Sequence, residues 1–213
     1  MHVGAPAFQG RRGSFKRGAR CDASSAAGSF LAILVRPDFD PLPRAADRVV
    51  LRRLAPSDLV RFQRYRTDPD VGRFQGWSAM SDAEAVAFLG AMSVSPFCPP
   101  GEWFQVAIAE PRAGILIGDI GIRVSQAQHE AEIGFTLDPA FQGRGLATEA
   151  VGSAIDLLFA TTPVARVVAV TDTRNRASIR LLERVGLQRV RTRNAVVHGE
   201  ACAEHVYSLA RAR

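Results

Sequence analysis

Cysteine is scarce in this chain, which has only Cys21, Cys98 and Cys202 among its 213 residues. Their number is odd and their spacing is wide, so they form neither a disulfide framework nor a cluster of metal ligands. No base or partner pattern surrounds Cys98 or Cys202, which argues against a nucleophilic-cysteine enzyme. We therefore expect a protein of a reducing compartment, the cytoplasm, that binds no metal.

Long apolar runs are missing too, and the excess of positive charge is confined to one end. No run of 18 or more apolar residues occurs, so we expect no membrane span and no membrane partner. Of the net charge of +6, residues 1–36 supply +5, because six basic residues there face a single acid, Asp22. The nearly neutral remainder gives no electrostatic reason to expect nucleic acid as the main partner.

The basic N-terminal part shows no regular hydrophobic pattern. Arg11-Arg12 and the apolar residues 30–35 faintly resemble a twin-arginine export signal, but the apolar part is short and no small-residue cleavage site follows. Prolines at positions 37, 41 and 43 indicate a linker. We expect residues 1–46 to be a basic, disordered extension with a linker, an export signal being the alternative. Residues 47–213 then form a single folded domain.

From Arg48 onward, hydrophobic periodicity predicts regular elements. The expected strands cover residues 48–54, 103–110, 115–124, 129–137, 166–171, 187–193 and 204–210. The expected helices cover residues 56–66, about 82–92 behind a Ser81–Glu84 capping box, 145–160, and about 175–186 ending at Gly186. Hairpins join the three middle strands, and helix 145–160 can connect parallel neighbours. The order predicts an α/β (α+β) fold with a mixed, mostly antiparallel sheet of about seven strands and about four flanking helices.

Two glycines bracket an arginine between the fourth expected strand and the third expected helix, at Gly143, Arg144 and Gly145. The first amides of a helix have no internal acceptor, and the helix dipole adds partial positive charge there. Glycines let a phosphate come close to those amides, and an arginine adds a charged donor. The stretch therefore predicts a phosphate-binding site.

Two common phosphate sites do not fit this stretch. A P-loop is excluded because no Lys-Ser or Lys-Thr follows the glycines. The dinucleotide fingerprint lacks its third glycine, which is replaced by Thr148, and its strand is interrupted by Glu132 and Thr136.

Four segments resemble the GNAT N-acetyltransferase superfamily. Gln142-Gly143-Arg144-Gly145-Leu146-Ala147 matches that family's acetyl-CoA loop, and residues 175–178 with 181–187 look like its second cofactor segment. Residues 47–52 and the loop at Gly76-Trp77 are similar to the RimJ/RimL-like branch, which acetylates the N-termini of ribosomal proteins. The resemblance covers about residues 47–211 and implies a sheet splayed between its fourth and fifth strands.

The resemblance also implies acetyl-CoA as cosubstrate and a set of contacts for it. The pantetheine arm is expected along the main chain of Phe135 and Leu137, and the pyrophosphate on the amides of residues 142–147. Asn175 is expected to reach the arm, with Ser178 nearby. The expected cofactor-binding residues are Phe135, Leu137, Gln142, Gly143, Arg144, Gly145, Leu146, Ala147, Thr148, Asn175 and Ser178.

Direct acetyl transfer needs a base for the amine and an acid for the leaving thiolate. Glu132 shares a strand face with Gly134 and Thr136 near the expected splay, so it is our candidate base. An ordinary strand carboxylate paired with an arginine is the alternative. In some family members a tyrosine near the end of the second cofactor segment acts as the general acid, but Leu182 occupies that position here. Ser178 is a possible substitute acid, and Tyr207 is a weaker candidate.

Phe74 and Trp77 lie in the loop that shapes the acceptor site in this family, so they are candidate substrate-binding residues. Simple packing of these rings is an equal alternative. The resemblance implies acetylation of a primary amine, either a protein N-terminus or a small molecule, by an enzyme that could be a homodimer. A catalytically silent acyl-CoA-binding regulatory module is the alternative of another class, and Leu182 favours it slightly.

Overall fold

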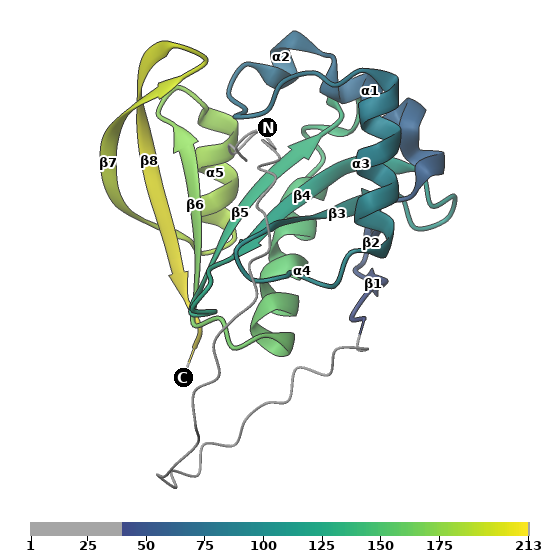
Figure 1. Cartoon of the computed structure of the whole chain (residues 1–213). Helices are drawn as coiled ribbons and strands as arrows, with labels where there is room; N and C mark the ends of the chain where they lie inside the picture. The colour runs from purple at the N-terminus through teal and green to yellow at the C-terminus, as the bar shows by residue number, and fades with distance from the viewer. Residues whose placement is uncertain (1–39, 213) are drawn as a thin grey trace, which may run out of the picture.

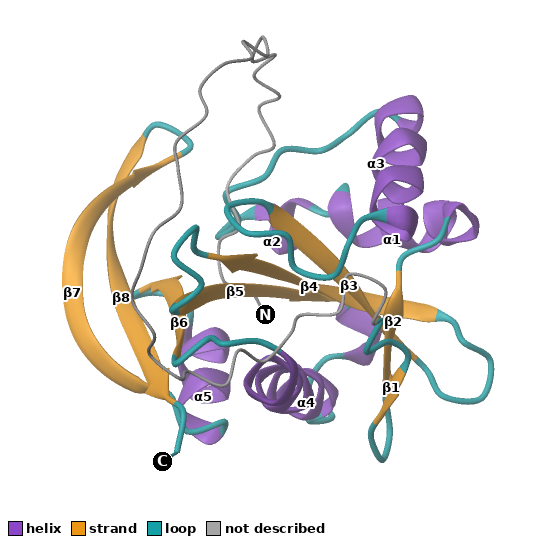
Figure 2. Cartoon of the chain, turned by 60° about the horizontal axis from the view of Figure 1, so that its bottom comes forward, coloured by secondary structure: helices purple, strands orange, loops and turns teal. Residues whose placement is uncertain are grey.

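The computed structural model describes residues 40–212, and these form an open eight-stranded sheet with helices on both faces (Figure 1). The strands lie in the order β1-β2-β3-β4-β5-β6-β8-β7. They are β1 (Arg44–Ala45), β2 (Val50–Arg53), β3 (Trp103–Ala109), β4 (Leu116–Val124), β5 (Glu130–Leu137), β6 (Arg166–Asp172), β7 (Gln188–Val197) and β8 (Glu200–Ala210). The helices are α1 (Leu59–Arg66), α2 (Pro69–Gly72), α3 (Asp82–Val94), α4 (Leu146–Thr161) and α5 (Arg176–Arg184). Helices α1 to α3 lie on one side of the sheet, and α4 and α5 lie on the other (Figure 2).

The mixed, mostly antiparallel fold predicted from the sequence is confirmed. Among the described strands β5 and β6 form the one parallel pair, and α4 is the crossover between them. Strands and helices number eight and five where about seven and four were expected. The additional helix, α2, is a single turn begun by Asp68, whose carboxylate accepts from the amide of Asp70 at 2.9 Å. One turn is too short to show a helical hydrophobic period, so the sequence pattern misses it.

The last two strands are longer than expected and form a hairpin. We expected strands at 187–193 and 204–210, but β7 and β8 continue until only His198 and Gly199 separate them. Both turn residues have positive φ, +51° and +81°. Two such residues form the tight turns that fit the twist of a hairpin. Gly199 was the sequence signal for this turn.

The boundary predicted at residue 46 needs correction, because residues 42–45 belong to the folded unit. Leu42 is 8% exposed and packs in the main core, while Arg44 and Ala45 pair with β2. Arg44 also donates to the Ser153 hydroxyl at 3.1 Å. Pro41 and Pro43 therefore lie beside a short edge strand, where a missing N–H is tolerated. The expectations for residues 1–39, including the extension and the export signal, lie outside the described residues.

We predict that Leu42→Ala lowers the free energy of unfolding by about 2 kcal/mol, because it removes a buried side chain from the main core. Urea denaturation of the full chain measures the effect. Val60→Ala, on an exposed side chain of α1, is the matched control and should change stability by less than about 0.5 kcal/mol. Equal small losses in both variants would place the start of the fold after residue 46.

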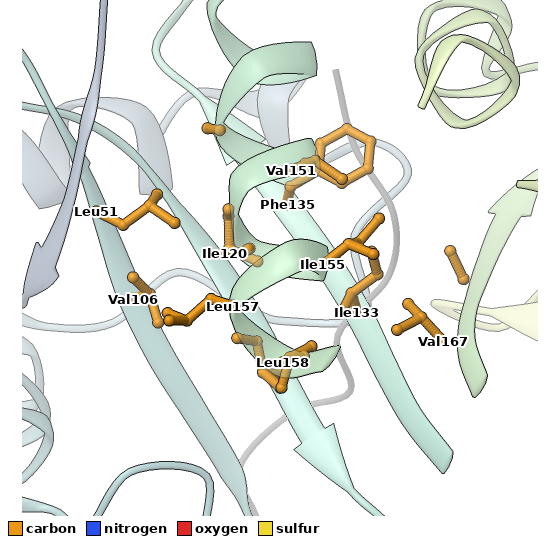
Figure 3. Packing of buried hydrophobic residues seen from close by; sticks show 14 of the residues in the cluster. Leu51, Val106, Ile120, Ile133, Phe135, Val151, Ile155, Leu157, Leu158 and Val167 are labelled. Carbon is orange, nitrogen blue, oxygen red and sulfur yellow. The ribbon is translucent and has the colours of Figure 1, made fainter. Parts of the chain in front are cut away.

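Two hydrophobic clusters cover the two faces of the sheet. The larger one packs α4 against the central strands, with Val151, Ile155 and Leu158 over Ile133 and the neighbouring strand residues (Figure 3). The smaller one packs α1 and α3 on the opposite face. The predicted Ser81–Glu84 capping box begins α3, with the Ser81 hydroxyl accepting from the Glu84 amide. The two clusters therefore cover both faces of the sheet at β3 and β4.

A buried ion pair ties α1 to β4 within the smaller cluster. Asp119 accepts from the Tyr65 hydroxyl at 2.7 Å and from Arg66 at 2.8 Å. The Arg66 guanidinium lies over the ring of Phe62 at 4.8 Å and over that of Trp77 at 4.5 Å. A cation held over aromatic faces in a desolvated place gains more than one at the surface. Arg66 thus fixes the loop residue Trp77 against the body.

The parallel pair β5–β6 opens after three residues. Glu130, Ala131 and Glu132 pair with Arg166, Val167 and Val168, and no further pairing joins the two strands. Strand β5 continues to Leu137 and β6 to Asp172, so their far ends diverge (Figures 1 and 2). This is the splay that the family resemblance predicted, and it leaves one edge of β5 without a neighbouring strand.

Candidate active site

Two cavities flank the splay. The first, here called the α4 cavity, has a volume of about 180 Å³ and lies between Leu137, the start of α4 and one face of α5. The second, the hairpin cavity, has about 590 Å³ and lies between the loop 73–76, the outer end of β6 and the β7–β8 hairpin. Ile133 and Phe135 face α4 (Figure 3). Side chains alternate along a strand, so Glu132 and Thr136 face the other side, where Glu132 lines the hairpin cavity and Thr136 contacts Gln75. A molecule threaded through the splay would reach both cavities.

The Gly-Arg-Gly turn forms one wall of the α4 cavity. Gly143 and Gly145 have φ of +74° and +78°, the left-handed region that favours glycine, and Gly145 is the N-cap of α4 without any side-chain cap. No atom beyond the neighbouring residues lies within 4 Å of where a Cβ of Gly143 would be. The cavity also contacts Leu146, Ala147 and Thr148, whose first-turn amides have no acceptor inside the helix. This open cradle of amides fits a phosphate group.

Three arginines surround this cradle without a carboxylate partner. Arg144 is at the exposed tip of the turn, and Arg180 and Arg184 line the cavity from α5. No ion pair involves any of the three within residues 40–212. Arg180 and Arg184 were missed from the sequence, although their spacing of four residues on one helix face was a usable signal. The α5 side of the cavity is therefore positively charged.

The free edge of β5 presents main-chain groups to the splay. The Asp138 amide donates to the Ile117 carbonyl of β4, and partners alternate along an antiparallel pair. The main-chain groups of Phe135 and Leu137 consequently face away from β4, toward the splay. Gln142 donates to the Leu137 carbonyl at 2.9 Å, so its side chain is turned toward this edge. An extended chain with amide groups could pair here as an added strand.

Glu132 lines the hairpin cavity at the closed end of the splay. Burial raises the pKa of its carboxyl, and the guanidinium groups of Arg123 and Arg193 oppose that rise. The expected alternative was a carboxylate paired with an arginine, but no ion pair of Glu132 occurs among the described residues. Arg193 is paired with Glu204 instead, at 3.0 Å. A half-buried carboxyl with a raised pKa in a cavity is suited to accept a proton near neutral pH.

The candidate acids Ser178 and Tyr207 are buried, and so is Leu182, which replaces the tyrosine of some relatives and has no acidic group. Leu182 and Ser178 are fully buried in or beside α5, and the Tyr207 hydroxyl donates to Glu183 at 3.2 Å. The second tyrosine of the chain, Tyr65, is bound to Asp119. Neither tyrosine lines either cavity. No side-chain acid is therefore assigned.

Asn175 and Ser178 lie at the N-terminus of α5, where they form a cap. The Asn175 side-chain oxygen accepts from the Ser178 amide at 3.2 Å, and both residues are buried. Neither belongs to the α4 cavity lining, although their neighbours Ala177 and Leu181 do. Their direct observed role is to begin the helix that carries Arg180 and Arg184.

Phe74 and Trp77, the two aromatic candidates for the acceptor site, lie in different surroundings. Phe74 lines the hairpin cavity, with the guanidinium groups of Arg73 and Arg174 at 5.2 and 5.8 Å from its ring centre. Trp77 is 6% exposed in the smaller core cluster, under Arg66. For Trp77 the packing alternative is therefore the one observed.

The hairpin cavity also contains residues that the sequence did not single out. Asp172 and Arg174 form an ion pair at 2.8 Å, which lowers the pKa of Asp172 against the effect of burial. His198, at the hairpin turn, donates to the main-chain carbonyl of Gln75. None of these residues follows a local motif, because the cavity is closed by segments far apart in the chain.

No group of three or more side chains able to hold a metal occurs within residues 40–212. Among the described helices, none is long and apolar enough to cross a membrane.

Comparison with known proteins identifies the family. The family model described as acetyltransferase (GNAT) domain matches residues 48–188. The uncharacterized N-acetyltransferase YoaA of Bacillus subtilis (strain 168) is 26% identical over 171 residues, covering 78% of this chain and 96% of YoaA.

Solved structures share the fold. The microcin C7 self-immunity acetyltransferase MccE, in complex with acetyl-CoA and AMP, has a TM-score of 0.67 at 17% identity, covering 78% of this chain and 94% of that one. The ribosomal L7/L12 alpha-N-protein acetyltransferase RimL, in complex with coenzyme A, has a TM-score of 0.69 at 15% identity, covering 79% and 97%.

The matched region contains both the splayed strand pair and the turn at the start of α4. It also spans more than half of the chain. The chain belongs to the GNAT acetyltransferase family and is an acetyl-CoA-dependent N-acetyltransferase, which transfers an acetyl group from acetyl-CoA to an amine.

Proposed function

We propose that this enzyme transfers the acetyl group directly to a primary amine bound in the hairpin cavity. The observation that carries the proposal is the unpaired part of β5, which lies between an anion cradle on one face and Glu132 on the other. A cosubstrate with a phosphate end and a reactive end needs such a passage between two cavities.

The α4 cavity suits the phosphates of acetyl-CoA. The turn amides around Gly143 and Gly145 would donate hydrogen bonds to the pyrophosphate. Arg144, Arg180 and Arg184 would add charge-assisted donors. The main-chain groups of residues 135 and 137 would pair with the amides of the pantetheine arm. Asn175 and Ser178 would act by holding the start of α5 in place.

The chemistry follows from what faces the hairpin cavity. Acetyl-CoA supplies an activated acetyl group, and the amine forms a C–N bond to its carbonyl carbon as the C–S bond breaks. Glu132 would take the proton of the amine, directly or through a water, and the thiolate would be protonated from solvent or a bound water. Holding both reactants in one slot supplies much of the acceleration.

Two kinds of acceptor amine are compatible with this proposal, a protein N-terminus and a small molecule. RimL is named for a protein N-terminus, and its fold is shared by this chain. The hairpin cavity, of about 590 Å³, is also within the size range of small-molecule sites. A peptide N-terminus and a free small amine both present one primary amine to Glu132.

An amine panel tests the proposal. Acetyl-CoA is incubated with peptides bearing a free N-terminus, with N-blocked peptides containing lysine, and with small amines, while CoA release and acetylated product are measured. We expect turnover with one of these classes. Acetyl-CoA binding without turnover on any class would count against a primary amine bound in the hairpin cavity.

We predict that Gly145→Val weakens CoA binding by about ten- to a hundredfold. A β-branched side chain is strained at φ of +78°, and its bulk would displace the first-turn amides from a phosphate, at the cost of a charged hydrogen bond or more. Calorimetry with CoA measures the loss. Gly152→Ala is the matched control, because it lies within the same helix with no atom within 4 Å of its Cβ position. Equal CoA affinity in a folded Gly145→Val protein would rule out this turn as the phosphate site.

A further inference from the structure

One side-chain hydrogen bond joins the two walls of the hairpin cavity. His198, in the turn between β7 and β8, donates from Nε2 to the main-chain carbonyl of Gln75 over a distance of 2.6 Å. The two residues are 123 positions apart in the chain. Figure 1 shows the tip of the β7–β8 hairpin beside the loop that follows α2, and both segments line the cavity. The bond therefore connects the hairpin to the loop at the rim of the cavity.

Gln75 is itself anchored to β5. It is 1% exposed, and its amide donates to the Thr136 hydroxyl at 3.1 Å and approaches the Phe135 carbonyl at 3.4 Å. Its main-chain amide donates to the Gly72 carbonyl at the end of α2. Phe135 is one of the residues whose main chain faces the splay. Gln75 thus links the hairpin tip to the strand along which the cosubstrate would lie.

The chemistry of the bond fixes the role of the imidazole. A carbonyl oxygen only accepts, so Nε2 of His198 must carry the proton. His198 has φ of +51° in this turn, and its ring contacts the loop through Nε2. The contact therefore joins the hairpin turn to the loop at Gln75.

We propose that His198 is a positioning residue, which holds the hairpin against the Gln75 loop so that the acceptor amine is kept facing the splay. The inference rests on the proposed function, because it assumes that the acceptor lies in the hairpin cavity. Without the bond, the hairpin moves independently of the loop and the acceptor is held less well. The α4 cavity, on the other face of the sheet, is unaffected.

His198→Ala tests the role through kinetics. We expect the KM of the best amine in the panel above to rise about two- to tenfold, the effect of one lost hydrogen bond, with unchanged affinity for CoA. His198→Gln keeps a side-chain N–H donor and should restore most of the loss. His129→Ala, an exposed histidine before β5 that lines neither cavity, is the matched control.

Amide hydrogen exchange tests whether the His198–Gln75 hydrogen bond holds the hairpin to the loop, and it needs no enzymatic turnover. In His198→Ala, residues 194–204 and 72–77 should exchange faster than in the wild type, and in His198→Gln they should not. The exchange experiment tests the role of His198 even if no amine in the panel is acetylated. That absence of acetylation would count against the proposed function alone. Unchanged exchange and KM in His198→Ala, equal effects of the Ala and Gln substitutions, or a loss of CoA affinity would overturn the positioning role.

Discussion

Glu132→Gln is expected to lower turnover by about 10²–10⁴-fold at neutral pH, with unchanged affinity for acetyl-CoA. The substitution keeps the size and hydrogen-bonding capacity of the side chain but removes its basicity. Glu132 faces the hairpin cavity and the phosphate cradle lies on the other face of β5, so the cosubstrate should still bind. Steady-state kinetics with a saturating amine and calorimetry with CoA measure the two quantities.

The pH dependence separates proton transfer from orientation. Burial raises the pKa of Glu132, so the wild-type rate should fall as the pH drops toward that raised value and the carboxylate becomes protonated. In Glu132→Gln the deficit should shrink as the pH rises, because the acceptor amine then deprotonates unaided. A deficit that is constant with pH would assign Glu132 an orienting role.

Stability provides an independent control for this variant. A carboxyl whose pKa is raised on folding contributes stability that is present below its unfolded pKa and lost as the pH rises through the folded value. Glu132→Gln should therefore melt no lower than the wild type at neutral pH. Glu130→Gln, on the same strand, removes an exposed carboxylate paired with Arg166 and should leave turnover near the wild-type rate. A similar loss of turnover in both variants would remove Glu132 from the mechanism.

Asp119→Asn is expected to lower the free energy of unfolding by about 3–5 kcal/mol, a large share of the total for a domain. The side chains of Asp119 and Arg66 are 3% and 4% exposed, and the substitution leaves the Arg66 charge buried without its carboxylate. Burial and the Asp119 carboxylate raise the pKa of the Tyr65 hydroxyl, and the substitution leaves that hydroxyl an uncharged amide oxygen in place of the carboxylate. Urea unfolding followed by circular dichroism measures the loss.

Two further variants identify the cause of that loss. Arg166→Gln breaks an exposed ion pair and should cost less than about 1 kcal/mol. Arg66→Met added to Asp119→Asn removes the unpaired charge, so the double variant should be more stable than Asp119→Asn alone. If the double variant is the less stable of the two, packing of Arg66 between Phe62 and Trp77 outweighs its charge.

The parts of the fold that the sequence predicted correctly are those with local signals. The strands around residues 103–137 are mostly apolar runs bounded by turn residues, and Ser81 with Glu84 marks the start of α3. Gly186, at φ of +91°, ends α5 as expected, with the Leu187 amide donating to the Leu182 carbonyl. The two-residue strand β1 and the one-turn helix α2 carry no such signal, because elements that short depend on their neighbours for stability.

The residues of the candidate site also differ in whether a local sequence signal predicts them. The cradle at Gly143 and Gly145 could be predicted because it is built from consecutive residues whose backbone conformation requires glycine. The contact of His198 with Gln75 could not, because it joins distant segments through a main-chain acceptor that every residue possesses. Trp77 shows a further limit, since a large ring is equally suited to a pocket and to a core.

The unpaired edge of β5 has a consequence for the solubility of the chain. A strand edge with free main-chain groups is a template on which another chain can add a strand, and such pairing leads to aggregation. Here the edge faces the splay, and β6 covers only its first three residues. Its carbonyls at residues 135 and 137 are also contacted by the amides of Gln75 and Gln142. The two glutamines therefore protect an incomplete sheet from self-association for as long as no ligand completes it.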